Sequence, residues 1–186
     1  MSFRFLLELD ARLSDQLRVA EKPGILRRIA VIFAHSGDSW FWAAALITCW
    51  FFSNSVWKQW EFVEFAGMAG LAIIVLTIKF MVRRQRPEGE WGGIYRNTDP
   101  HSFPSGHAAR AFLIAAIASA LGPTWLGLLL WIWAPLVALA RVAMGVHYLS
   151  DVLVGAILGV IVAWIGLQIY QPLLTRLITL IGYPLW

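Results

Sequence analysis

Three short polar segments interrupt an otherwise apolar chain, and their side chains could carry out chemistry together. The segments are Lys79-Phe-Met-Val-Arg-Arg-Gln-Arg86-Pro87, Pro104-Ser105-Gly106-His107 and Arg141-Val-Ala-Met-Gly-Val-His147-Tyr-Leu-Ser-Asp151. Anionic phosphate oxygens need guanidinium forks, an ammonium charge and backbone N–H donors, and a helix that starts at Ser105-Gly106 would supply the last of these. The combination therefore predicts a site for a phosphoryl group.

The third segment pairs an imidazole with a carboxylate, because His147 precedes Asp151 by about one helical turn. A carboxylate that accepts the Nδ1–H bond leaves Nε2 free to attack phosphorus, and it stabilises the cation that forms. A second imidazole, His107, can protonate the leaving oxygen and then activate the water that cleaves the phosphohistidine. The pattern predicts a hydrolase with a covalent intermediate at His147.

Each segment alone has a simpler interpretation. Lys79 and the arginines that follow it could hold their charges at a membrane interface, Pro104-Ser105 could only begin a helix, and Asp151 could only favour a first turn. All of these would have to meet by accident at the ends of four membrane spans, so we favour the catalytic interpretation. Four further polar residues lack partners at informative spacing and are expected in loops, turns or caps: His35, Asp38, Asp99 and His101.

Membrane spans are the elements that must position these residues. Hydrophobic residues make up 59% of the 186 residues and charged residues 14%, and the mean hydropathy is +0.67, which is far above that of a soluble protein. The apolar runs predict five spans, at about residues 39–52, 62–81, 105–121, 124–144 and 150–170.

The predicted fold class is all-α, a polytopic membrane helix bundle with about five transmembrane spans, six being possible. Residues 1–186 would form a single membrane domain. Residues 1–35 would be interfacial helices, because their apolar side chains recur at spacings of three and four between charges. Residues 39–170 would be the catalytic bundle and residues 171–186 a short apolar tail. Five spans bring the ends that carry the three polar segments to one face of the membrane.

The pattern Lys-x6-Arg-Pro, Pro-Ser-Gly-His and Arg-x5-His-x3-Asp resembles the type 2 phosphatidic acid phosphatase family, which is related to bacterial acid phosphatases and vanadium haloperoxidases. The resemblance covers residues 79–151. It implies that His147 is the nucleophile, His107 the acid and Asp151 the partner of His147. The phosphate-binding residues that it implies are Lys79, Arg86, Ser105, Gly106 and Arg141.

The sequence departs from the family pattern at Ala140, where a serine usually precedes the arginine, so a hydroxyl near the phosphate pocket is missing. Residues 88–103 would form the lip of the pocket and set its selectivity through Arg96, Asp99 and His101. Arg110, one turn beyond the start of the third span, could add a charge contact.

These features predict a metal-independent membrane phosphatase that acts on a lipid phosphate or diphosphate. Candidate substrates are undecaprenyl diphosphate, phosphatidylglycerol phosphate and phosphatidic acid, with the 1-phosphate of lipid A as an alternative. A vanadate-dependent haloperoxidase would share the pocket but acts on soluble substrates. A non-catalytic lipid-binding protein would be expected to have lost one of His107, His147 and Asp151.

No cofactor or metal is expected, because the pocket holds one carboxylate and its cations take the place of Mg²⁺. Cys49 is the only cysteine, which excludes an internal disulfide. The pI near 9.6 does not indicate nucleic acid, because the 11 Trp and 11 Phe lie within apolar runs. The expected partners are the bilayer and the lipid substrate, and the sequence does not predict an oligomeric state.

The expected location is the cell (inner) membrane. Six Lys and Arg residues precede the first span on the face of the active site, and the positive-inside rule would turn that face towards the cytoplasm. The charges of the pocket itself are functional, however, and the resemblance includes bacterial members that face outward. The expectation is therefore an extracytoplasmic active site.

Overall fold

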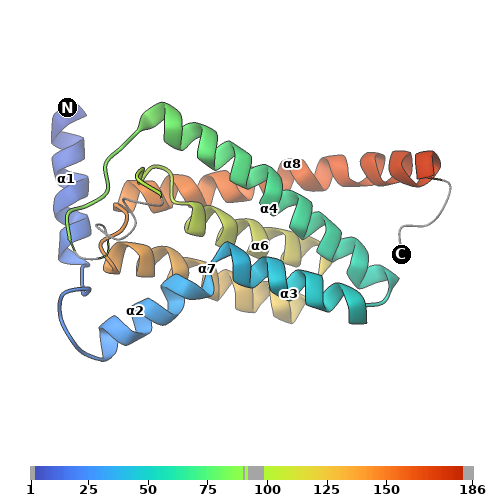
Figure 1. Cartoon of the computed structure of the whole chain (residues 1–186), viewed down its shortest axis with the longest axis horizontal. Coiled ribbons are helices and arrows are strands. Elements are labelled where there is room, and N and C mark those ends of the chain that lie inside the picture. The colour runs from blue at the N-terminus through green and yellow to red at the C-terminus, as the bar shows by residue number, and fades with distance from the viewer. Residues whose placement is uncertain (1–2, 90, 92–98, 182–186) are drawn as a thin grey trace.

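The computed structural model describes residues 3–89, 91 and 99–181, and all of its regular elements in this part of the chain are helices (Figure 1). The helices are α1 (Phe3–Gln16), α2 (Ile25–Ser36), α3 (Ser39–Phe52), α4 (Ser55–Val82), α6 (Gly106–Leu121), α7 (Thr124–Ala143) and α8 (Leu149–Ile181). The all-α fold class predicted from the sequence is confirmed.

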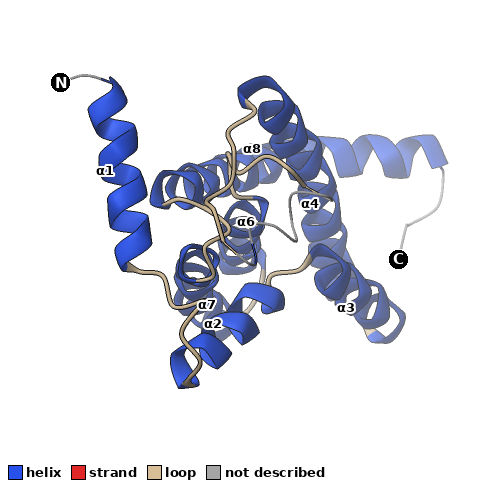
Figure 2. Cartoon of the chain, turned by 60° about the vertical axis from the view of Figure 1, so that its left-hand side comes forward, coloured by secondary structure: helices blue, strands red, loops and turns tan. Residues whose placement is uncertain are grey.

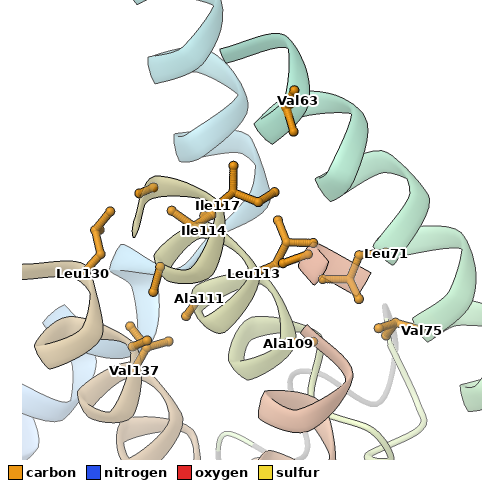
Figure 3. Close-up of a cluster of buried hydrophobic side chains, with 14 of the residues drawn as sticks. Val63, Leu71, Val75, Ala109, Ala111, Leu113, Ile114, Ile117, Leu130 and Val137 are labelled. Carbon is orange, nitrogen blue, oxygen red and sulfur yellow. The ribbon is translucent and has the colours of Figure 1, made fainter. Parts of the chain in front are cut away.

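Helix α6 lies at the centre of the bundle, with α4, α7 and α8 around it (Figure 2). Its sequence is apolar on nearly every side, as expected for a helix that is buried all round. Leu113 and Ile117 of α6 pack in one core cluster with Leu71 of α4 and Val137 of α7 (Figure 3). The first turn of this central helix carries Gly106 and His107, so the core fixes their position.

Two glycines bring α8 unusually close to α6. A Cβ atom on Gly159 would lie 2.0 Å from the carbonyl oxygen of Ala109, and one on Gly155 would lie 2.5 Å from that of Ser105. Side chains cannot be accommodated at such distances. Small residues four positions apart are a common means of close packing between membrane helices. The contact also joins the helix starts, because the Ser105 N–H donates to the Asp151 carbonyl oxygen at 3.0 Å.

Within the described residues, three helices contain stretches long and apolar enough to cross a membrane: Trp57–Val82, Thr124–Ala143 and Leu149–Tyr170. Helices α3 and α6 are apolar but have 14 and 16 residues, fewer than the roughly 20 that a helix perpendicular to the bilayer needs. Large apolar side chains cover the outer surface of the bundle, as at Phe52, Ile73 and Ile132. A surface of this kind fits lipid rather than water.

Two helix ends differ from the sequence prediction. Helix α4 begins at Ser55 rather than Phe62, because the Asn54 side chain accepts the Trp57 N–H bond at 3.2 Å and so supports an earlier start. Helix α8 continues through Pro172 to Ile181 instead of ending at Tyr170. Proline removes one backbone hydrogen bond, which a helix can tolerate. The expected tail is therefore part of a helix as far as Ile181, and residues 182–186 lie outside the described part.

Helix α1 lies beside the start of α8, at the end of the bundle where the three polar segments meet (Figure 1). Its leucines and Phe5 are exposed, whereas Ser14 is buried. The Ser150 N–H donates to Asp10 Oδ1 at 3.0 Å, and the Leu149 N–H donates to Ser14 Oγ at 2.9 Å. Residues from α1 therefore satisfy the free N–H groups at the start of α8.

Candidate active site

The three polar segments converge at one end of the bundle. Lys79 comes from the last turn of α4, Ser105 caps α6, and His147 follows the tight turn between α7 and α8. Gly145 makes this turn with a φ of 65°, a conformation that favours glycine. Six of the predicted site residues are almost inaccessible to solvent, at 3% exposure or less: Lys79, Arg86, Ser105, Arg141, His147 and Asp151.

A cavity of about 220 Å³ is lined by two of these residues, Lys79 and His147. Its polar wall includes Lys79, His107 and His147, together with Asp99, Gly106 and Arg110. Its apolar wall is supplied by α4, through Met68, Leu71, Ala72, Val75 and Leu76. The cavity therefore has charged residues at one end and apolar residues along one side. This lining suits a ligand with an anionic group attached to an apolar chain.

His147 and Asp151 lie together, as the sequence predicts, but not at hydrogen-bond distance. His147 Nδ1 is 3.6 Å from Asp151 Oδ2, and the same oxygen accepts the Tyr148 N–H bond at 2.8 Å. On its other side, His147 Nε2 lies 3.3 Å from Arg86 Nη1. Burial lowers the pKa of His147 well below its ordinary value of 6.5, and the charges of Arg86, Arg141 and Lys79 lower it further. The imidazole is therefore neutral near pH 7, as a nucleophile must be.

Asp99 connects two of the predicted phosphate ligands. Its Oδ2 accepts from Lys79 Nζ at 2.5 Å and from Arg86 Nη2 at 2.8 Å. The Lys79 ammonium also donates to the His101 carbonyl oxygen at 2.8 Å, and Arg86 Nη1 donates to the Val146 carbonyl oxygen at 2.8 Å. Asp99 and His101, which the sequence placed in a loop without partners, thus hold these cations in place. Arg96 lies outside the described residues.

The start of α6 offers fewer donors than expected. Ser105 accepts from the Ala108 N–H through its side chain at 3.5 Å, and its own N–H is used by the Asp151 carbonyl oxygen. Gly106 and His107 occupy the first helical positions, where the N–H groups have no acceptor within the helix. These two N–H groups, rather than that of Ser105, are the donors that a phosphate oxygen could meet.

Asp38 is the residue that sequence reasoning missed most clearly. It was expected to serve as a turn residue or cap, but its Oδ1 lies 2.7 Å from His107 Nε2 and its Oδ2 lies 3.2 Å from His35 Nδ1. Burial alone would raise the pKa of Asp38, but hydrogen bonds and charge from His107 and His35 outweigh burial and lower this pKa to about 2. Asp38 is therefore ionised throughout the physiological range.

The sequence favours an interfacial charge at Arg84, but this residue joins α1 to Asp151, the predicted partner of His147. Its Nη1 donates to Asp151 Oδ1 and its Nη2 to Asp10 Oδ2, both at 2.7 Å. The available signal was the pair Asp10 and Ser14, which stand one turn apart on α1. Arg110 turns to the Gly37 carbonyl oxygen, with donors at 3.0 and 2.6 Å, although it also lines the cavity.

The described residues contain no group of three or more His, Cys, Asp or Glu side chains that could hold a metal ion. What they do assemble is a neutral imidazole, a second imidazole paired with a carboxylate, and a set of buried cations around one cavity. Such a site can bind an oxyanion and carry out nucleophilic attack on it.

Comparison with known proteins also indicates a phosphatase. Residues 61–174 match the model of the PAP2 superfamily. The chain is 28% identical over 192 residues to the probable lipid phosphate phosphatase beta of Arabidopsis thaliana, with 88% of this chain and 89% of the relative covered. It is 37% identical over 103 residues to the decaprenylphosphoryl-5-phosphoribose phosphatase of Mycobacterium tuberculosis, with 55% and 56% covered.

Two solved structures share the fold. The crystal structure of Aquifex aeolicus LpxE superposes with a TM-score of 0.70 at 27% identity, and the match covers 86% of this chain and 95% of LpxE. The PAP2-type phosphatidylglycerolphosphate phosphatase of Bacillus subtilis gives a TM-score of 0.72 at 22% identity, with 90% and 87% covered. Because the family model spans more than half of the chain, this membrane protein belongs to the PAP2 superfamily and is a lipid phosphate phosphatase.

Proposed function

We propose that the protein hydrolyses a lipid phosphate or diphosphate, without a metal ion, through a phosphohistidine at His147. The observation that carries this proposal is the cavity, which has His147, Lys79 and His107 at its polar end and apolar residues of α4 along its side. A lipid can place its phosphate at the polar end while its chain follows α4 into the bilayer.

In the proposed mechanism, cations hold the phosphoryl oxygens while the imidazole attacks. The ligands are the predicted Lys79, Arg86 and Arg141, together with N–H groups at the start of α6. Neutral His147 Nε2 forms the bond to phosphorus, and the bond to the leaving oxygen breaks. His107 gives a proton to that oxygen, then takes one from the water that attacks the phosphohistidine. The products are the lipid alcohol, or the lipid monophosphate from a diphosphate, and inorganic phosphate.

Asp151 would stabilise the imidazolium that forms on His147. Its Oδ2 lies 3.6 Å from Nδ1 in the structure, so a small rotation of either side chain would bring the two atoms to hydrogen-bond distance. Arg84 and the Tyr148 N–H hold the carboxylate in this position.

The substrate is proposed to be undecaprenyl diphosphate, phosphatidylglycerol phosphate or phosphatidic acid, with the 1-phosphate of lipid A as the alternative. The support is the apolar wall of the cavity and the lipid names of the relatives.

We further propose that α3 and α6 cross the membrane with the three longer helices, which gives five spans, and that the site faces away from the cytoplasm. Accessibility of a cysteine introduced at the exposed Glu88 to an impermeant reagent, in a variant whose own exposed Cys49 is replaced by serine, tests the orientation.

A phosphate-release panel on the purified protein in detergent tests the function. We expect release from at least one of these lipids, no loss of activity in excess EDTA, and no activity in His147→Ala. A radiolabelled substrate should leave label on the wild-type protein that is stable in alkali and lost in acid, as a phosphoramidate is. Full activity in His147→Ala, or inhibition by EDTA that one divalent ion reverses, would overturn the proposal.

A further inference from the structure

The corner between α2 and α3, residues His35–Asp38, packs tightly against the start of α6. The Trp133 indole N–H donates to Ser36 Oγ and the Trp42 indole N–H to the Ser36 carbonyl oxygen, both at 2.9 Å. A Cβ on Gly37 would lie 2.8 Å from Val137 Cγ1, so the backbone is pressed against α7. Together with the two hydrogen bonds from Arg110 to Gly37, these contacts fix the corner relative to α6 and α7.

Asp38 stands at the position where an aspartate ordinarily caps a helix. It is the N-cap residue of α3, yet its side chain makes no capping hydrogen bond, although such bonds stabilise helix starts. Its carboxylate instead bridges two imidazoles, 2.7 Å from His107 Nε2 and 3.2 Å from His35 Nδ1. The side chain of Asp38 is 18% exposed and that of His107 is 19% exposed. The Asp38 side chain therefore does not cap α3 but contacts His107, the candidate acid.

This contact has a chemical consequence for His107. A carboxylate on Nε2 fixes the ring, directs the proton on Nε2 away from the substrate and leaves Nδ1 to serve the leaving oxygen. Its negative charge also stabilises the imidazolium form that a general acid requires. Burial of the ring and the positive charges of Arg141 and Arg110 oppose this form. A nearby anion is therefore needed if His107 is to carry a proton when the leaving group departs.

We propose that Asp38 is the positioning residue of the general acid His107, with a role parallel to that of Asp151 towards His147. The proposal rests on the mechanism given above and adds a second Asp–His pair to it. His35 supports the pair from the outer side, where its own side chain is 45% exposed. Asp38 itself does not touch the reacting atoms.

A leaving-group comparison tests the proposal. An alkoxide leaves poorly without a proton, whereas 4-nitrophenolate leaves well without one, so the acid matters for the first and little for the second. For Asp38→Asn we expect kcat with a short-chain phosphatidic acid to fall about 10- to 100-fold, while kcat with 4-nitrophenyl phosphate stays within about threefold. His107→Ala should give the same split with a larger loss. Asp38→Glu, which keeps the charge, should recover part of the lost activity.

A matched control and a double variant complete the experiment. Asp15→Asn makes the same chemical change at an exposed carboxylate, 76% exposed, and should leave both activities unchanged. In a His107→Ala background, Asp38→Asn should cause no further loss, because it acts through the imidazole. Retained hydrolysis of 4-nitrophenyl phosphate shows that the variant is folded.

The outcomes separate this inference from the proposed function. An equal loss on both substrates in Asp38→Asn, or no loss on either, would overturn the role of Asp38 while His107→Ala still shows the split. Normal activity in both His107→Ala and His147→Ala would overturn the mechanism itself, and the inference with it.

Discussion

The active site contains two Asp–His pairs that differ in how the fold builds them. His147 and Asp151 are four residues apart on either side of the start of α8, almost fully buried, with 3.6 Å between Nδ1 and Oδ2. His107 and Asp38 are 69 residues apart, partly exposed, and lie 2.7 Å from one another. The first pair depends on local geometry and the second on the packing of α2 and α3 against α6. A spacing rule can find only the first.

The largest expected difference between the pairs lies in their histidines. His147→Ala removes the proposed nucleophile, so we expect kcat to fall at least about 10⁴-fold on every substrate. His107→Ala removes an acid, so the expected loss is about 10²- to 10³-fold and depends on the leaving group. Steady-state phosphate release on alkyl and aryl substrates measures both. If kcat on the aryl substrate fell equally in the two variants, the proposed roles of nucleophile for His147 and acid for His107 would be contradicted.

The aspartates should show a smaller difference in the same direction. Asp151→Asn weakens the partner of the imidazolium and also the ion pair with Arg84. Asp38→Asn weakens two imidazole contacts and the charge interaction with Arg110, but breaks no ion pair with an arginine among the described residues. We expect a loss of about 10³-fold in kcat for Asp151→Asn, with a clear drop in the apparent melting temperature in detergent, and no such drop for Asp38→Asn. An Asp151→Asn protein with wild-type kcat would contradict the role assigned to the buried pair.

The acid limb of the pH profile reports on the buried pair. Because burial and nearby cations lower the pKa of His147, its neutral form persists as the pH falls through 6.5, and activity should be lost only at lower pH. The acid limb of kcat/KM, corrected for ionisation of the substrate phosphate, should therefore lie below the value of an ordinary histidine. A limb at or above pH 6.5 would show that His147 is more solvated than the structure implies.

The smallest expected effect concerns the support from α1. Asp10→Asn weakens the cap on α8 and the ion pair with Arg84, which should cost about 1 kcal/mol of stability. Thermal unfolding in detergent should show a modest decrease, with kcat much less affected than in Asp151→Asn. Glu8→Gln, an exposed carboxylate on the same helix, is the matched control. A loss of kcat as large as that of Asp151→Asn would make α1 part of the catalytic apparatus.

The sequence predicted the helices and the motif residues because both depend on short-range patterns. Apolar runs predict α3, α6 and α7 closely, and a four-residue spacing predicts that His147 and Asp151 lie near one another. Asp38 and Arg84 could not be found in this way, because their partners are brought close by packing between distant helices. The end of α8 was also missed, since a proline that would stop a helix in water is tolerated in this one.

The glycine contact between α8 and α6 has a consequence for how one scaffold can accept different lipids. With Gly155 and Gly159 against the backbone of α6, the first turns of both helices behave as one stiff block, which carries His107 and Asp151 and is joined to His147 two residues before α8. Neither helix can shift to suit a bulkier substrate without disturbing the chemistry. Adaptation to new lipids is therefore left to the apolar wall of α4, where a side chain can change size while the reaction geometry is preserved.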